Sequence, residues 1–125
     1  MRFDDGLAVL REVLGEDYAR RAEAGRAHPF AAPFTEIATE AAWGGAWARD
    51  DLDRRTRSLV TLGMLLAIGA PGEVKLHTRG ALRNGATREE VRAVVLHAVA
   101  YCGVPRALEG LRAVMAALKE LDGAD

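Results

Sequence analysis

The sequence predicts an all-α protein, and three observations support this. Apolar side chains recur at intervals of three and four residues along most of the 125-residue chain. No stretch shows the period of two, rich in β-branched residues, that is typical of a half-buried strand. Prolines, glycines and a capping box divide the chain into about six helical stretches. A chain of this length suits one core, so we expect a single-domain helical bundle over residues 1–125.

The first predicted helix is a short amphipathic one that follows Asp4. Its carboxylate is a candidate N-cap, because it can accept a hydrogen bond from a backbone N–H of the first turn. Gly15 stands where this helix should end. Residues 16–28 contain too few large apolar side chains for a core helix. We expect them to form a surface segment with one or two helical turns.

A further helix is predicted to begin at Pro33, because proline suits the first turn of a helix. It should end near Trp43-Gly44-Gly45, since two consecutive glycines disfavour helix. We therefore expect Trp43 and Trp47 to lie at a bend.

The stretch from about Arg54 to Ile68 predicts the most buried helix of the protein. Apolar side chains surround it almost completely after the opening arginines, which leaves no wide polar face. Asp53 is its candidate N-cap. Gly69 should end it.

The next helix should begin at Pro71 and close at Asn84-Gly85, a dipeptide that supplies a left-handed residue. Thr87-Arg88-Glu89-Glu90 is a capping box, the strongest local signal in the chain, and it predicts a helix that runs to Tyr101. Gly103 should stop that helix. Pro105 is a candidate first-turn residue for the last one.

Composition excludes several classes of function. Lys plus Arg number 17 against 18 Asp plus Glu, so no overall field attracts nucleic acid or an anionic membrane. The single cysteine, Cys102, excludes an intrachain disulfide and zinc sites built on several thiolates. The first twenty residues lack the apolar core of a secretion signal, and no apolar run reaches about 18 residues. We expect a cytoplasmic protein without nucleic-acid or membrane partners.

Glu73 and His77 are the first candidate catalytic pair. They stand four residues apart, so a helix places them on one face. A carboxylate one turn before an imidazole can orient the ring and raise its pKa, which prepares a general acid near neutral pH. The alternative is a solvated surface pair, which is the commoner role of this spacing.

Several motifs resemble the γ-carboxymuconolactone decarboxylase family in order and spacing, over nearly the whole chain. Residues 16–33 fit least well. The motifs are Val13-Leu14-Gly15, Trp43-Gly44, Trp47-Ala48-Arg49, Leu52, Arg55-Thr56-Arg57-Ser58-Leu59, Glu73-Val74-Lys75-Leu76-His77, Asn84-Gly85-Ala86-Thr87-Arg88-Glu89-Glu90 and Tyr101-Cys102-Gly103-Val104-Pro105-Arg106-Ala107.

The resemblance implies the all-helical fold shared with the alkyl hydroperoxide reductase D proteins, and homo-oligomers such as hexamers or trimers. It also implies decarboxylation of 4-carboxymuconolactone to the β-ketoadipate enol-lactone, in the protocatechuate branch of aromatic catabolism. The departing carboxylate is conjugated with the lactone, which therefore acts as the electron sink. We expect no cofactor and no metal, since the substrate supplies its own electron sink and the thermolysin-like zinc spacing is absent.

The family likeness also suggests roles for individual residues. His77 would supply the proton and Glu73 would orient its ring. Arg49 and Arg57 would hold the substrate carboxylates, with Arg79 as a weaker third choice, because a planar guanidinium matches a carboxylate. The alternative for the two main arginines is simple ion pairing with the aspartates around them.

Two aromatic residues and the cysteine complete the set of candidates. Trp47 could stack on the ligand ring or fill volume. His97 could face the pocket or serve as a core or interface histidine. Cys102 is interpreted as a small buried hydrophobe.

The sequence departs from the patterns of both branches of the family at several positions. The Cys-x-x-Cys of the reductase branch is replaced by Ala70 and Glu73, which excludes a dithiol relay. Ala41, Ala93 and His97 stand where the decarboxylase branch commonly has tyrosine, glutamate and glutamine. The alternative function is therefore an oligomeric protein of this fold that acts on, or only binds, another lactone or keto acid.

Overall fold

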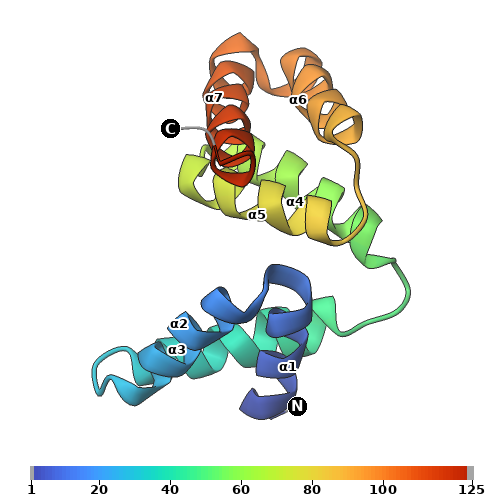
Figure 1. Cartoon of the computed structure of the whole chain (residues 1–125). Coiled ribbons are helices and arrows are strands. Elements are labelled where there is room, and N and C mark those ends of the chain that lie inside the picture. Colours follow the sequence, from blue (N-terminus) through green and yellow to red (C-terminus); the bar gives the residue numbers. More distant parts are fainter. Residues whose placement is uncertain (1, 124–125) are drawn as a thin grey trace. The chain divides into compact units, whose positions relative to one another are not determined.

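A computed structural model describes residues 2–123, and every regular element in that range is a helix (Figure 1). The predicted all-α class is confirmed, with more helices than the expected number. The elements are α1 (Phe3–Leu14), α2 (Glu16–Ala27), α3 (Ala32–Ala38), the π-helix η1 (Thr39–Trp47), α4 (Arg54–Ile68), α5 (Pro71–Arg83), α6 (Arg88–Cys102) and α7 (Val104–Leu121).

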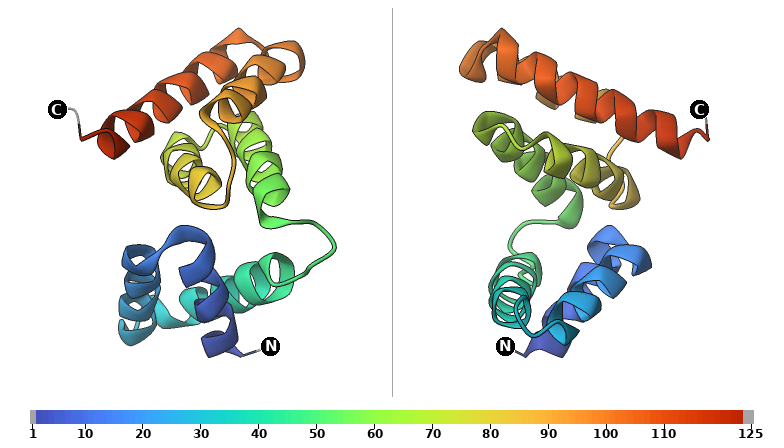
Figure 2. Two further views of the ribbon diagram at one scale, coloured as in Figure 1. Left: turned by 45° about the vertical axis from the view of Figure 1, so that its right-hand side comes forward. Right: turned by 90° about the vertical axis from the view of Figure 1, so that its left-hand side faces the viewer.

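The helices form two compact units, with the boundary between Asp53 and Arg54. The N-terminal unit contains α1, α2, α3 and η1, and the C-terminal unit contains α4 to α7 (Figures 1 and 2). Each unit has its own cluster of buried apolar side chains. Within the C-terminal unit α4, α5 and α6 each pack against α7.

In the N-terminal unit, α1 packs against η1 and α2. Its buried side chains include Phe3, Leu7 and Leu10. Gly6 allows the close approach of α1 to η1, because a Cβ at this position would lie 2.5 Å from the carbonyl oxygen of Thr39. The lack of a side chain at Gly6 therefore sets how closely α1 and η1 can pack.

Two predictions for this unit were wrong at the level of helix ends. The N-cap of α1 is Arg2 and not Asp4, because the Asp5 carboxylate accepts a hydrogen bond from the Arg2 backbone N–H at 3.4 Å and the helix begins earlier. Gly15 does end α1, with φ of +102°. The segment after it is a regular 12-residue helix rather than one or two turns.

The glycine pair does not end a helix either. Residues 39–47 continue α3 as a π-helix that passes through Gly44 and Gly45. Trp43 and Trp47 therefore lie on one helix instead of at a bend, and their rings stack with centroids 5.3 Å apart. Packing of two indoles offsets the conformational cost of the glycines. Segments of π-helix are rare in proteins, and those that occur frequently lie at functional sites.

In the C-terminal unit, α4 matches its predicted bounds but not its predicted burial. Ser58, Leu62 and Leu66 form one buried row. The row of Val60, Met64 and Ile68 is 43%, 63% and 69% exposed. The sequence shows apolar residues all round this helix, yet α5, α6 and α7 cover only part of it.

The remaining helix boundaries follow the sequence. The helix α5 begins at Pro71, and Gly85 after it has φ of +99°. Thr87 and Glu90 form the predicted capping box at the start of α6. Gly103 separates α6 from α7 with φ of +86°, and Pro105 lies in the first turn of α7. None of the described helices is long and apolar enough to cross a membrane.

Candidate functional site

His77 lies on the buried face of α5 and is only 6% exposed. Burial lowers its pKa from 6.5 to about 4, because an imidazolium loses its hydration in this position. This direction is the opposite of the one predicted from the Glu73 spacing. The Glu73 side chain is exposed, and no hydrogen bond joins it to His77 in the structure.

The lowered pKa fixes the protonation state of the free protein. At pH 7 the His77 ring is neutral, since the pH lies well above the lowered pKa. A neutral imidazole can donate one N–H and accept at its other nitrogen. It becomes an acid only if a bound anion raises its pKa again.

Other polar groups are buried along the contact of α4 with α5. Ser58 is almost fully buried, and its hydroxyl accepts a hydrogen bond from the Asn84 side-chain amide at 3.0 Å. The Thr78 hydroxyl donates to the backbone carbonyl of Val74 within α5. The Ser58 to Asn84 bond was not predicted, because no local pattern reports a contact between residues on two helices.

The three candidate arginines lie in different environments. Arg49 donates from Nε and Nη2 to one oxygen of Asp51, at 2.9 and 2.7 Å, and both side chains are exposed. This is the surface ion pair that the sequence left open as an alternative. Arg79 contacts Glu120 of α7 at 3.3 Å. Arg57 is half-buried on α4, next to Ser58.

Trp47 is buried in the N-terminal unit, where its ring stacks on Trp43. This arrangement agrees with a role in filling volume, which was one of the two alternatives for the residue. Stacking on a ligand remains a prediction for Trp47.

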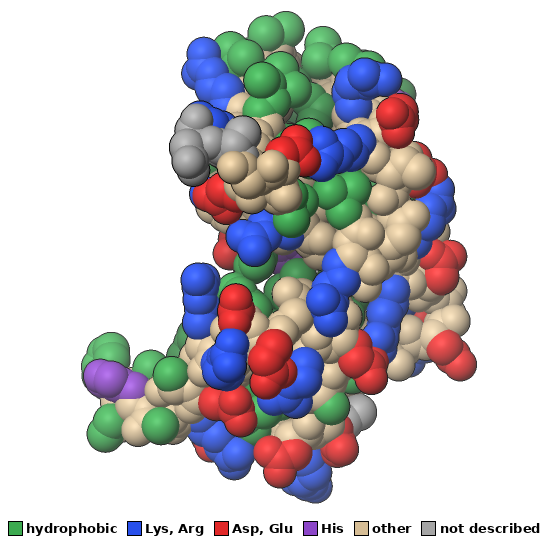
Figure 3. Space-filling view, viewed as in Figure 1, with side chains coloured by type: hydrophobic (Ala, Val, Ile, Leu, Met, Phe, Trp, Pro, Cys, Tyr) green, Lys and Arg blue, Asp and Glu red, His purple; other side chains and the backbone are tan. Residues whose placement is uncertain are grey.

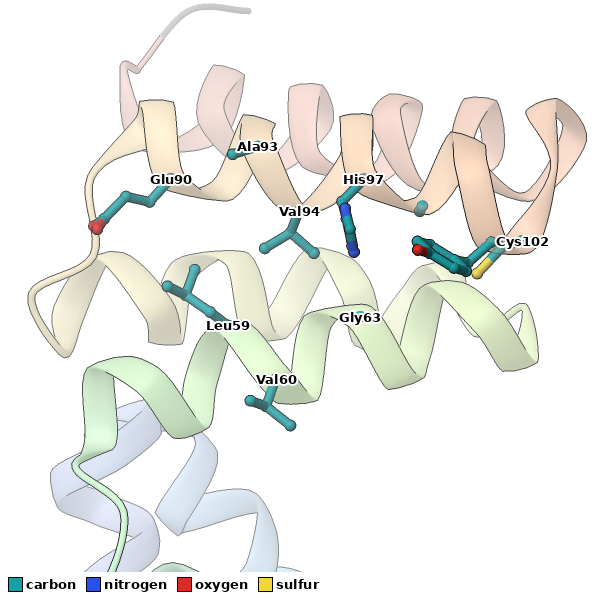
Figure 4. A pocket seen from close by; sticks show the side chains of 10 residues that line it. Leu59, Val60, Gly63, Glu90, Ala93, Val94, His97 and Cys102 are labelled. Carbon is teal, nitrogen blue, oxygen red and sulfur yellow. The ribbon is translucent and has the colours of Figure 1, made fainter.

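His97 lies in an open groove of about 780 Å³ between α4 and α6. Val94 and His97 project from α6 toward α4, where Gly63 has no side chain (Figure 4). The His97 ring also packs against Tyr101, with centroids 5.0 Å apart. Apart from His97, Tyr101, Cys102 and Glu90 at one end, apolar residues line the groove, which has no arginine or lysine.

This groove is poorly suited to an acid with two carboxylates. Glu90 repels an anion, and its own carboxylate already accepts hydrogen bonds from Arg55 and from the Thr87 backbone N–H. Cys102 is partly buried at the other end. His97 therefore lies in a groove whose lining does not suit a ligand with two carboxylates.

Metal ligands do not gather at either histidine. Within residues 2–123, no three His, Cys, Asp or Glu side chains lie close enough to hold a metal ion. Basic and acidic side chains are interspersed over the face of the N-terminal unit that Figure 3 shows. This mixture matches the near-zero formal charge of the chain.

Comparison with known proteins adds three likenesses. A family model described as the carboxymuconolactone decarboxylase family matches residues 32–116. The nitrosuccinic acid decarboxylase of Metarhizium robertsii is 48% identical over 109 residues, which cover 87% of this chain and 76% of that protein. The 4-carboxymuconolactone decarboxylase of Acinetobacter baylyi is 36% identical over 120 residues, which cover 96% and 89%.

Proposed function

Because this chain belongs to the carboxymuconolactone decarboxylase family, we propose that it decarboxylates a small acid that carries its own electron acceptor. The observation that carries the proposal is the likeness, over most of the chain, to two decarboxylases named for such acids. The departing carboxylate leaves an electron pair, which a nitro group or a conjugated lactone can accept. No cofactor is then needed as an electron sink.

We place nitrosuccinic acid first among the substrates, because the relative named for it shares 48% identity with this chain. Loss of carbon dioxide from the carbon that bears the nitro group would leave a nitronate. Protonation of that carbon then gives 3-nitropropanoate. The Ala41, Ala93 and His97 departures from the carboxymuconolactone pattern agree with this order.

The second substrate is 4-carboxymuconolactone, supported by the relative that is 36% identical over 96% of the chain. Here the electrons pass through the ring alkene to the lactone carbonyl oxygen, and protonation of the α-carbon gives the enol-lactone. Both reactions need the same three services from the protein: recognition of carboxylates, stabilisation of a developing oxyanion, and delivery of one proton to carbon.

His77 is the residue that we assign to proton delivery. Its buried imidazole is neutral in the free protein. An anion bound beside the ring favours the imidazolium, so the substrate would draw one proton onto His77 as it binds. The charged ring would first donate a hydrogen bond to the nitronate or dienolate oxygen and then give its proton to carbon.

Arg57 is our first choice for holding a carboxylate, because it is half-buried on the helix that packs against α5. To hold a substrate carboxylate, Arg49 would have to give up its ion pair with Asp51. Arg79 would likewise have to give up its ion pair with Glu120. We keep both, with Trp47 and His97, as weaker proposals. The proposed role of Glu73 is limited to placing negative charge near the start of α5.

We also propose that the chain forms a homo-oligomer. The exposed row of Val60, Met64 and Ile68 on α4 supports association, since large apolar residues in a continuous row are typical of interfaces. Hexamers and trimers are the expected states. A cytoplasmic location remains a prediction.

The test is a side-by-side assay of the purified protein with nitrosuccinic acid and freshly prepared 4-carboxymuconolactone. Proton NMR identifies the product, and kcat/KM decides the order of the two acids. His77→Gln and His77→Leu serve as paired variants, because glutamine keeps an N–H donor but neither side chain transfers a proton. Wild-type turnover by both variants would remove His77 from the mechanism. Failure to decarboxylate either acid would leave the alternative, a binding protein or an enzyme for another acid.

Proton uptake offers a second test that needs no turnover. Succinate has the two carboxylates of nitrosuccinic acid but no electron sink. Calorimetry in buffers of different ionisation enthalpy should show uptake of about one proton per succinate bound at pH 7, and none with His77→Gln. Binding without proton uptake by the wild type would contradict the assigned protonation of His77.

A further inference from the structure

A pocket in the N-terminal unit has features of a ligand site, and the proposed decarboxylation does not use this pocket. Its volume is about 290 Å³, and its walls come from α1, α2, α3 and η1. Aliphatic side chains form part of the lining. The chemistry-bearing residues that line it are Tyr18, Arg21, Phe34, Thr35, Thr39 and Trp43.

Arg21 is the one charged residue in this lining. Two other arginines of α2 are engaged, since Arg20 pairs with Asp17 and Arg26 pairs with Glu36. Arg21 has no carboxylate within ion-pair distance in the described part of the chain, and its guanidinium lies 6.0 Å from the centroid of the Tyr18 ring. Its charge therefore remains available to an anion at the pocket.

Thr39 supplies a second, independent indication. The residue is only 3% exposed and lines the pocket. Its methyl carbon Cγ2 and its backbone carbonyl lie against Gly6 of α1. Its hydroxyl makes no hydrogen bond to any residue between 2 and 123. A hydroxyl at the wall of a pocket can donate a hydrogen bond to a ligand oxygen.

The aromatic residues favour a flat ligand. Tyr18 and Trp43 come from different helices, and the exposed Phe34 adds a third ring. The π-helix, an uncommon element, carries Trp43 and stacks it on Trp47. Flat conjugated groups stack well on such rings.

We propose that this pocket binds a small planar carboxylate, with the carboxylate at Arg21 and its conjugated plane against Trp43 and Tyr18. The Thr39 hydroxyl donates to an oxygen of the ligand. Tyr18 and Arg21 precede residue 32, where the match to the family model begins. The pocket lining contains neither His77 nor Arg57, the residues assigned first to decarboxylation.

Tryptophan fluorescence tests the proposal directly, because the chain has two tryptophans and both lie in η1. Benzoate is the probe, with benzyl alcohol as the planar neutral control and cyclohexanecarboxylate as the non-planar anionic control. We expect benzoate to give a saturable change and both controls to bind at least about tenfold more weakly. A tenfold loss is the scale of one charge-assisted hydrogen bond.

Arg21→Gln should weaken benzoate binding about tenfold and leave decarboxylation unchanged. Arg20→Gln is the matched control, since it removes an adjacent, exposed arginine that pairs with Asp17. Thr39→Val removes the hydroxyl with little change in volume and should also weaken binding. Equal binding by the Arg21 and Arg20 variants would overturn the proposal.

His77→Gln separates this site from the proposed reaction. Benzoate should bind that variant as it binds the wild type, whether or not the protein decarboxylates either acid. Loss of benzoate binding in His77→Gln would place the probe at His77 and overturn the proposal. A failed decarboxylation assay with intact, Arg21-dependent benzoate binding would overturn only the proposed function.

Discussion

Acid pH should destabilise this protein through His77. Its pKa is about 4 when folded and 6.5 in the ordinary, exposed state. Between these values the unfolded chain binds more protons than the folded one, so stability falls as pH falls. Above pH 6.5 both states are neutral at this residue and the penalty vanishes. One pKa unit corresponds to about 1.4 kcal/mol, so the penalty reaches about 3 kcal/mol near pH 4.

Urea unfolding at several pH values, followed by helical circular dichroism, measures this penalty. His77→Gln is the comparison, because glutamine is polar and does not titrate. Carboxylates such as Glu120 and Asp122, whose pKa values lie below normal beside Lys75 and Arg88, contribute equally to both proteins and cancel. The wild type should lose about 3 kcal/mol more than the variant between pH 7.5 and pH 4. Identical pH dependence in both proteins would show that His77 is not buried as a neutral ring.

The other predictions concern activity, packing and association. His77→Gln should lower kcat by about a hundredfold to ten thousandfold and also raise KM, because the imidazolium attracts the bound anion; both are measured on whichever acid is turned over. Glu73→Gln should change kcat less than twofold, because no hydrogen bond links Glu73 to His77; a loss matching that of His77→Gln would contradict this. Gly6→Ala should lower thermal stability, since its Cβ would lie 2.5 Å from the Thr39 carbonyl, and unchanged melting would show that α1 can shift. Sedimentation should show an oligomer that Met64→Asp weakens, and a wild-type monomer at micromolar concentration would refute association through α4.

Most helix ends could be predicted because local chemistry sets them. Thr87 and Glu90 satisfy backbone N–H groups of their own turn, so the capping box marks a helix start without help from distant residues. Gly85 and Gly103 adopt positive φ values that other residues rarely adopt. The Gly44 and Gly45 prediction failed because stacking of Trp43 on Trp47 in η1 competes with the local preference of glycine.

The candidate residues show where local reasoning stops. The spacing of Glu73 and His77 correctly placed both on α5, but it could not show that one side chain is exposed and the other buried. Arg49 illustrates the reverse case, because the adjacent Asp51 already indicated an ion pair. No local sequence pattern predicts the pocket that contains Arg21 and Thr39, since its lining residues come from four helices.

The sequence by itself determined the all-α class, the bounds of α4 and α5, and the family resemblance, because hydrophobic period, capping residues and motif order are properties of neighbouring residues. Only the tertiary structure decided that His77 is neutral, that one row of α4 is exposed, and that Thr39 and Arg21 line one pocket. Burial depends on which distant side chains displace water from a group. That displacement sets the pKa of an imidazole.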